Sequence, residues 1–120
     1  MKYYYNNTLI RTSKTHKYTH AVINEVDGKV ICYGCSSSKA GAEKIKNTEI
    51  SYYQRRIANG QNALKALDAG KSGYYYKDGR HTEFIKFEDH DREYYERYID
   101  EAEQAVERYN KWQIVEVEER

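Results

Sequence analysis

Two cysteines and two histidines have the clearest capacity for chemistry in this sequence. Cys32 and Cys35 form a C-x-x-C pair, and His16 and His20 precede it with the spacing H-x-x-x-H. Such ligand spacings are typical of structural zinc sites, although the order here is the reverse of a zinc finger. A C-x-x-C pair beside the start of a helix can also act as a redox centre, because the helix dipole lowers the thiol pKa.

The strand register expected around these cysteines argues against a shared metal, and nothing in the sequence identifies a base or a resolving partner for a redox site. Asp27-Gly28, between two apolar runs, predicts the two-residue loop of a type I′ hairpin. Counting outward from that loop places Cys32 and Cys35 on opposite faces of the strand pair. We therefore expect two small buried thiols and solvent-facing histidines. Whether these side chains bind a metal stays open.

The remaining motifs give no catalytic assignment. The sequence contains neither G-x-G-x-x-G nor G-x-x-x-x-G-K, the loops that cradle phosphates. The acidic residues at 88–91 resemble metal ligands, but carboxylates at that place are expected to cap a following helix and complement its dipole. We therefore predict that the protein is not an enzyme and needs no cofactor.

Basic and aromatic residues on three neighbouring elements indicate ligand binding instead. Arginine side chains grip phosphates bidentately, and aromatic rings stack on bases. The alternative for each arginine is a surface ion pair with a nearby Glu. The predicted ligand-binding residues are Arg55, Arg56, Arg80, Phe84, Tyr98 and Arg108.

The charge balance restricts the kind of ligand. The formal net charge is only +1, whereas affinity for duplex nucleic acid comes from a strongly basic surface. A small anionic nucleotide needs only two or three cations in one pocket. The sequence therefore favours a nucleotide over a nucleic acid duplex.

The composition predicts one folded domain, residues 1–120, with a thin aliphatic core. Tyrosine is the commonest residue, at 14 of 120, whereas Leu, Ile, Val and Phe together make up only about a sixth of the chain. Long tyrosine-rich helices need additional cover, so we expect a homo-oligomer, a dimer or larger. The run Tyr3–Tyr5 is expected to dock on another chain, as the simplest explanation of exposed rings at a terminus.

Targeting signals and membrane spans are not expected from this sequence. The first residues, MKYYYNN, lack the apolar segment of a signal peptide, and no stretch approaches 18 apolar residues. A disulfide between two cysteines this close in sequence would not cross-link distant parts of a domain of this size. We therefore expect a protein of a reducing cytoplasm.

The pattern of turns and apolar residues predicts an α+β fold with the order ββ(β)-α-ββ-α-β. Residues 8–12 are expected to add a strand, and Asp78-Gly79 predicts the loop of a second hairpin. A final short strand is expected at residues 114–117. Both faces of the first hairpin are partly apolar, so it should be central or covered on two sides.

Two long helices separate these strands. The first is expected to run from a serine N-cap at residues 36–38 to Gly70 at its C-terminal end, with a kink or close packing at Gly60. The second is expected to begin near Asp89 or Asp91. Its apolar side runs from Tyr95 to Trp112 with helical spacing.

Part of the chain resembles the phage head–tail joining protein W family. The matching segments are ALxxLxxGK at 63–71, KDGRxxEF at 77–84 and YI at 98–99, about the middle third of the chain. This resemblance implies a helix, a small hairpin and a second helix. The chain differs from that family in its long N-terminal part, with another hairpin, and in its C-terminal extension.

The organisation of the whole chain resembles the phage Thoeris anti-defence sponges, in size, element order and placement of arginine and aromatic residues. This resemblance implies a phage-encoded oligomer in the host cytoplasm. Such a protein sequesters cyclic ADP-ribose-like signals without degrading them, and some of the family also hold cyclic oligonucleotides. The alternative is a structural or interaction protein of a phage, such as a head–tail adaptor or a direct inhibitor of a host defence nuclease.

Overall fold

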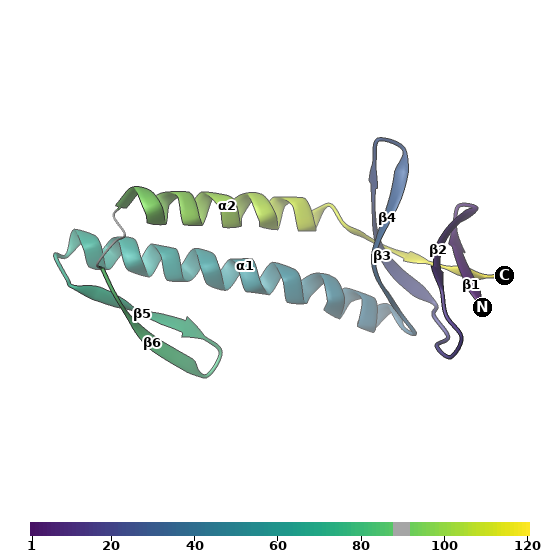
Figure 1. Cartoon of the computed structure of the whole chain (residues 1–120), viewed down its shortest axis with the longest axis horizontal. Helices are drawn as coiled ribbons and strands as arrows, with labels where there is room; N and C mark the ends of the chain where they lie inside the picture. Colours follow the sequence, from purple (N-terminus) through teal and green to yellow (C-terminus); the bar gives the residue numbers. More distant parts are fainter. Residues whose placement is uncertain (88–91) are drawn as a thin grey trace. The chain divides into compact units, whose positions relative to one another are not determined.

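The computed structural model describes residues 1–87 and 92–120 and has the expected α+β fold (Figure 1). The described elements follow the predicted order, with one further strand near each end of the chain. The chain divides into two compact units, which we call the sheet unit (residues 1–49 and 109–120) and the helical unit (residues 50–108). The single domain over residues 1–120 stays a prediction.

The described strands and helices have the following bounds. They are β1 (Lys2–Tyr5), β2 (Thr8–Thr12), β3 (His20–Val26), β4 (Lys29–Ser36), α1 (Lys39–Asp68), β5 (Gly73–Asp78), β6 (His81–Lys86), α2 (Arg92–Asn110), β7 (Gln113–Glu116) and β8 (Glu118–Glu119). The strand at residues 8–12 and the late strand are therefore confirmed. The predicted start of the second helix, at Asp89 or Asp91, lies outside the described residues.

The sheet unit contains two antiparallel sheets, with the strand orders β2-β1-β8 and β4-β3-β7. β3 is central in its sheet, and its residues Ala21, Val22 and Ile23 are all fully buried. Adjacent residues of a strand point to opposite faces, so both faces of β3 are covered, as its apolar pattern predicted. Val22 packs in a cluster with Ala42 and Trp112.

The expectation that Tyr3–Tyr5 dock on another chain is wrong. These residues form β1, which pairs with both β2 and β8 of the same chain. The side chain of Tyr3 is fully buried, and its hydroxyl donates a hydrogen bond to the carbonyl oxygen of His16 at 2.8 Å. The turn from β1 to β2 uses Asn6 and Asn7, both with positive φ, as a type I′ loop requires.

The ends of α1 follow the predicted signals. The hydroxyl of Ser38 accepts a hydrogen bond from the amide of Gly41 at 3.0 Å, which makes Ser38 the N-cap. At the other end Gly70 has a φ of +69°, and its amide bonds to the carbonyl of Leu67. The amide of Lys71 bonds to the carbonyl of Ala66, which completes a Schellman motif.

The hairpin of β5 and β6 turns one residue later than predicted. Asp78 pairs with His81, so the loop consists of Gly79 and Arg80 rather than Asp78 and Gly79. Gly79 takes a φ of +59° at the first loop position, which is the glycine position of a type II′ turn. Asp78 stays in the strand, where its carboxylate forms an ion pair with Arg55.

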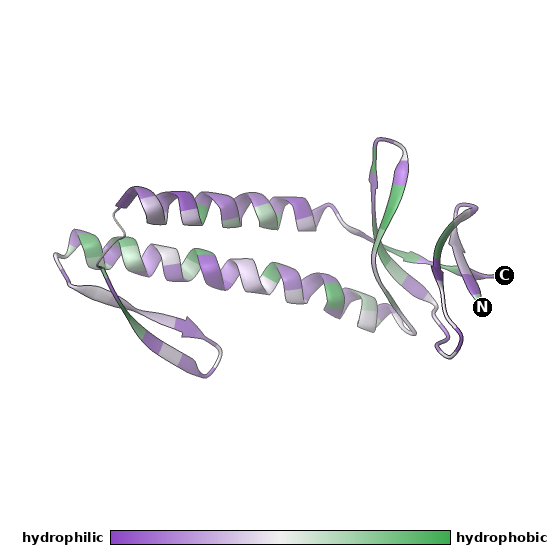
Figure 2. Cartoon of the chain, viewed as in Figure 1, coloured by the Kyte–Doolittle hydropathy of each residue, from purple (hydrophilic) through white to green (hydrophobic). Residues whose placement is uncertain are grey.

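Aromatic rings packed on alanines form the core of the helical unit. Ala63 and Ala66 of α1 lie against Tyr74 of β5 and Tyr95 of α2. The two tyrosine rings meet edge to face, with centroids 5.5 Å apart. The buried members of this core are alanines and tyrosines, whereas Leu64 and Leu67 are only partly buried against it. Hydrophobic residues recur as separate bands along both helices (Figure 2). Within the described residues, neither helix combines the length and hydropathy needed to cross a membrane.

Candidate functional site

A groove of about 840 Å³ lies in the helical unit, between the last turns of α1 and the strand β5. Ala66 and Ala69 form its helical wall together with Asn62 and Lys65, and residues 71–75 with Lys77 form the opposite wall. The chain enters β5 directly after the Schellman turn at Gly70, so the strand runs back along the helix it has just left. The sharp end of α1 therefore creates the groove.

Two exposed aromatic rings border the groove. Tyr75 and Phe84 face each other across β5 and β6, with ring centroids 5.2 Å apart. Their exposed fractions are 61% and 48%, which is high for rings of this size. Gly73 allows Phe84 to lie close to the strand, because a Cβ atom on Gly73 would meet the ring at 2.6 Å. The groove thus offers an aromatic surface to a flat ligand.

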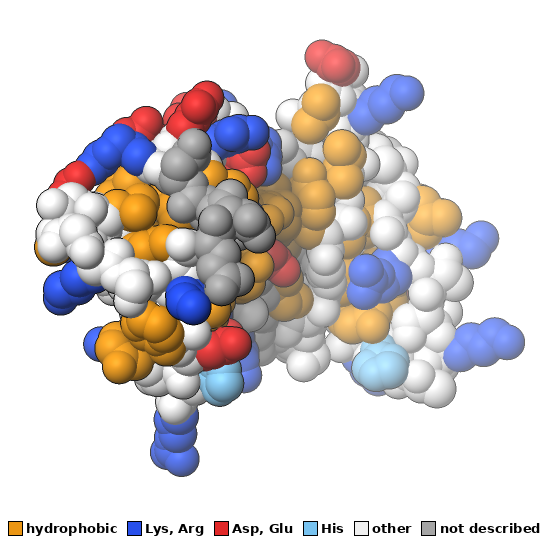
Figure 3. Space-filling view, turned by 60° about the vertical axis from the view of Figure 1, so that its left-hand side comes forward, with side chains coloured by type: hydrophobic (Ala, Val, Ile, Leu, Met, Phe, Trp, Pro, Cys, Tyr) orange, Lys and Arg blue, Asp and Glu red, His pale blue; other side chains and the backbone are white. Residues whose placement is uncertain are grey.

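Three lysines, Lys65, Lys71 and Lys77, line the same groove, and none of the acidic residues within 1–87 and 92–120 does. Lys65 lies on α1, Lys71 lies in the turn, and Lys77 lies on β5. In Figure 3 this end of the helical unit comes forward, and hydrophobic side chains (orange) lie exposed beside Lys and Arg side chains (blue). Such an arrangement suits an anionic ligand that also carries a ring.

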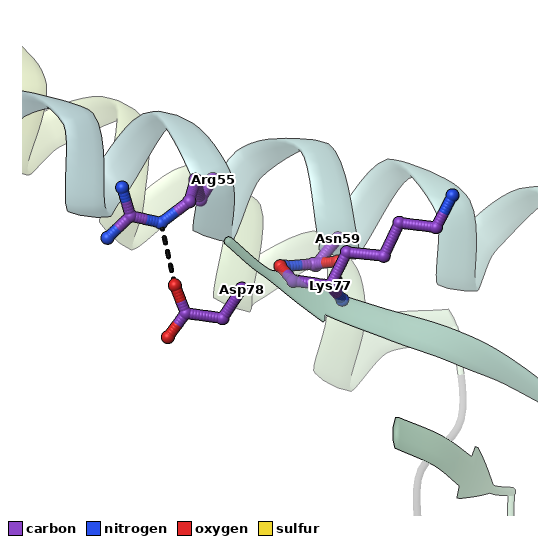
Figure 4. Close-up of polar contacts among 4 residues, drawn as sticks. All are labelled: Arg55, Asn59, Lys77 and Asp78. Carbon is purple, nitrogen blue, oxygen red and sulfur yellow. Dashed lines mark hydrogen bonds and ion pairs between the residues drawn. The ribbon is translucent and has the colours of Figure 1, made fainter. Parts of the chain in front are cut away.

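The buried side chain of Asn59 fixes one end of the groove. Its amide nitrogen donates to the carbonyl oxygen of Lys77 at 2.8 Å, and its amide oxygen accepts from the Lys77 amide at 2.9 Å. Next to this pair, Nε of Arg55 lies 3.1 Å from the carboxylate of Asp78 (Figure 4). Both contacts hold the end of β5 against α1, so the groove wall is fixed there.

The structure separates the predicted binding residues. Phe84 lines the groove, but Arg55 is paired with Asp78 outside it. Arg56 lies over the ring of Tyr98, 4.2 Å from its centroid, and pairs with Glu101. Arg55 and Arg56 therefore form ion pairs, which was the alternative to ligand binding for each arginine.

Arg56 and Tyr98 belong to a second, smaller hollow of about 160 Å³. It is too small for a nucleotide, because small-molecule sites are typically about 300–1,000 Å³. Arg80 and Arg108 line neither hollow. The lysines of the groove were missed, although a signal existed: Lys65 and Lys71 flank the helix end at Gly70, and the chain had to turn back there.

Burial changes the acidity of three tyrosine hydroxyls in the helical unit. Burial, and secondarily the neighbouring Tyr95, raise the pKa of Tyr74 well above its ordinary value. Burial also raises the pKa values of Tyr95 and Tyr98. The side chains of Tyr74 and Tyr95 are both buried and share a hydrogen bond, so they belong to the core of the helical unit.

The two cysteines lie on the same face of β4, and the prediction of opposite faces is wrong. A β-bulge shifts the register between Val22 and Ile23, so that Ile23 pairs with Cys32 and Ala21 pairs with Cys35. The two Sγ atoms are 3.7 Å apart. Within residues 1–87 and 92–120, no three His, Cys, Asp or Glu side chains lie close enough together to hold a metal ion.

No family model, curated protein or solved structure matches this chain. The geometry of the groove and the residues that line it are therefore the basis for a function of this chain.

Proposed function

We propose that this protein binds a small anionic nucleotide in the groove between α1 and β5 and does not transform it. The observation that carries the proposal is the exposed Tyr75–Phe84 pair beside three lysines in one groove. Stacking of a base on an aromatic side chain contributes about 1–3 kcal/mol, and lysines supply the charge that phosphates need. The groove volume, about 840 Å³, lies within the range of small-molecule sites.

The biological role that fits this binding is sequestration of a cyclic nucleotide immune signal, cyclic ADP-ribose-like or a cyclic oligonucleotide, by a phage-encoded protein in the host cytoplasm. The similarity in size and element order to the Thoeris anti-defence sponges supports this role. A sponge acts by stoichiometric binding, so it needs affinity and abundance and no catalytic groups. A homo-oligomer, with one groove per chain, belongs to the same proposal.

Calorimetry with AMP, ADP-ribose, cyclic ADP-ribose isomers and cyclic di- and trinucleotides tests the proposal. We expect binding by at least one of them that weakens with salt, because lysines contact the phosphates. Lys71→Gln should weaken binding several-fold. Arg108→Gln removes the same charge outside the groove and should leave affinity unchanged. If none of these ligands binds, or if both variants behave alike, the proposed site is wrong.

The second candidate is a structural or interaction protein, a head–tail adaptor or a direct inhibitor of a defence nuclease. It is favoured by three half-exposed apolar side chains on the β3–β4 hairpin, Val26, Ile31 and Tyr33. Exposed apolar residues gathered on one hairpin are typical of protein contacts. Direct binding to a purified phage portal protein or defence nuclease, lost in Ile31→Lys, would favour this candidate over the nucleotide.

A further inference from the structure

The outer edge of β5 already binds one planar group through its main chain. The Lys77 amide and carbonyl both face α1, because both bond to the side chain of Asn59. A carboxamide carries a donor and an acceptor side by side in one plane. The contact therefore shows that a planar donor–acceptor pair fits this edge.

The same edge continues into the groove at Tyr75. In an antiparallel pair, main-chain groups point alternately toward the partner strand and away from it, so Tyr75 has the same outward direction as Lys77. Tyr75 lines the groove, and neither its amide nor its carbonyl bonds to any group outside the β5–β6 ladder in the described residues. The groove thus presents an open donor and acceptor.

The α1 wall of the groove carries a second carboxamide, that of Asn62. Asn62 follows Asn59 by three residues, which places both amides on one side of α1. Asn62 lines the groove and is exposed, and its side chain has no hydrogen bond within the described part of the chain. A flat ligand inserted beside Tyr75 would meet hydrogen-bonding groups on both walls.

We infer that β5 recognises an adenine base through the main chain of Tyr75, an inference that rests on the proposed nucleotide binding. The adenine amino group at N6 donates to the Tyr75 carbonyl, and a ring nitrogen beside it accepts from the Tyr75 amide. Adenine has such an acceptor on both sides of its amino group, N1 and N7, so either edge reproduces the Asn59 contact. Lys65 and Lys71 then lie near the phosphates.

A pair of ligands that differ only in the amino group tests this inference. Purine riboside 5′-monophosphate is AMP without its N6 amino group, so it keeps the ring, the ribose and the phosphate. We expect AMP to bind about tenfold more tightly in calorimetry, because the analogue leaves the Tyr75 carbonyl unpaired. Equal affinities would overturn the inference and leave nucleotide binding intact. If no nucleotide binds at all, the proposed function itself fails.

Two substitutions of Tyr75 test whether its main-chain amide contributes to binding. Tyr75→Thr and Tyr75→Pro both remove the ring, but only proline removes the amide hydrogen. That amide points away from β6, so proline costs no hydrogen bond of the hairpin. We expect AMP to bind about tenfold more weakly to Tyr75→Pro than to Tyr75→Thr. Equal affinities of two variants that both melt cooperatively would overturn main-chain recognition, and the ligand pair decides the question if the proline variant does not fold.

Discussion

The Sγ atoms of Cys32 and Cys35 lie 3.7 Å apart on one face of β4, because the β-bulge opposite Val22 and Ile23 brings them together. This separation is larger than the S–S bond of about 2.05 Å, yet small enough for one thiol to reach a mixed disulfide on the other. Burial, and secondarily the nearby Cys32, raise the pKa of Cys35 to about 11. Cys35 is therefore protonated at neutral pH and becomes more reactive as the pH rises.

Oxidised glutathione should therefore convert the pair into an intramolecular disulfide. One thiolate attacks the reagent and releases one glutathione thiol, and the second thiolate attacks the mixed disulfide and releases the other. Mass spectrometry should show the loss of two hydrogens, at a rate that increases with pH. Cys35→Ser should stop at the glutathione adduct. A glutathione adduct that persists on the protein with both cysteines would contradict the prediction.

The register of the β3–β4 hairpin could be predicted from the sequence only in part. Asp27 and Gly28 both have positive φ, as the type I′ loop predicted, and the four pairs nearest the turn follow from it. The local pattern of turn and apolar residues does not predict the bulge, which lies where β4 packs closely against α1. Gly34 lies so close to Ile45 of α1 that a Cβ atom there would meet its side chain at 3.1 Å.

The candidate site was predictable to a similar extent. Local signals were enough to predict that α1 ends at Gly70 and that a β-hairpin follows it. Spacing alone cannot tell which cations remain available to a ligand. Arg55 and Arg56 form ion pairs with Asp78 and Glu101, residues distant in sequence, whereas three lysines line the groove, namely Lys65, Lys71 and Lys77.

Replacing Asn59 should loosen the hairpin. Asn59→Ala removes two hydrogen bonds to the main chain of Lys77 and leaves a buried space, so we expect a loss of about 2 kcal/mol in the free energy of unfolding. Urea denaturation measures this loss. Asn62→Ala, one turn further along α1 and exposed, should change stability by less than about 0.5 kcal/mol. Equal effects would mean that the amide pair does not hold β5.

Gly60 should tolerate no side chain. The sequence left a kink or close packing open at this position, and a Cβ atom would meet Cγ1 of Ile99 at 2.5 Å, so the close packing is confirmed. Gly60→Ala gains about 1 kcal/mol of helix propensity, but the overlap with α2 costs about 1–3 kcal/mol. We expect net destabilisation in urea denaturation.

A double-mutant cycle with Ile99→Ala separates these two contributions. Shortening Ile99 removes the atom that Gly60→Ala would meet, so Gly60→Ala should stabilise the protein in the Ile99→Ala background. If Gly60→Ala destabilises both backgrounds equally, the contact between α1 and α2 at this position is not as close as the structure has it.

Stability should decrease in alkaline solution because of the buried tyrosines. Tyr74 keeps its proton in the folded state at a pH where the unfolded chain, with an ordinary pKa of 10.0, has released it. Above the unfolded-state pKa, the unfolded chain binds fewer protons than the folded protein. The free energy of unfolding is therefore constant below the unfolded-state pKa and falls as the pH rises from there towards the folded-state pKa. Urea denaturation between about pH 8 and about pH 11 measures the fall. Tyr74→Phe should reduce it, whereas Tyr75→Phe, at a 61% exposed position, should not. A decline of the same size in both variants would show that Tyr74 is not its source.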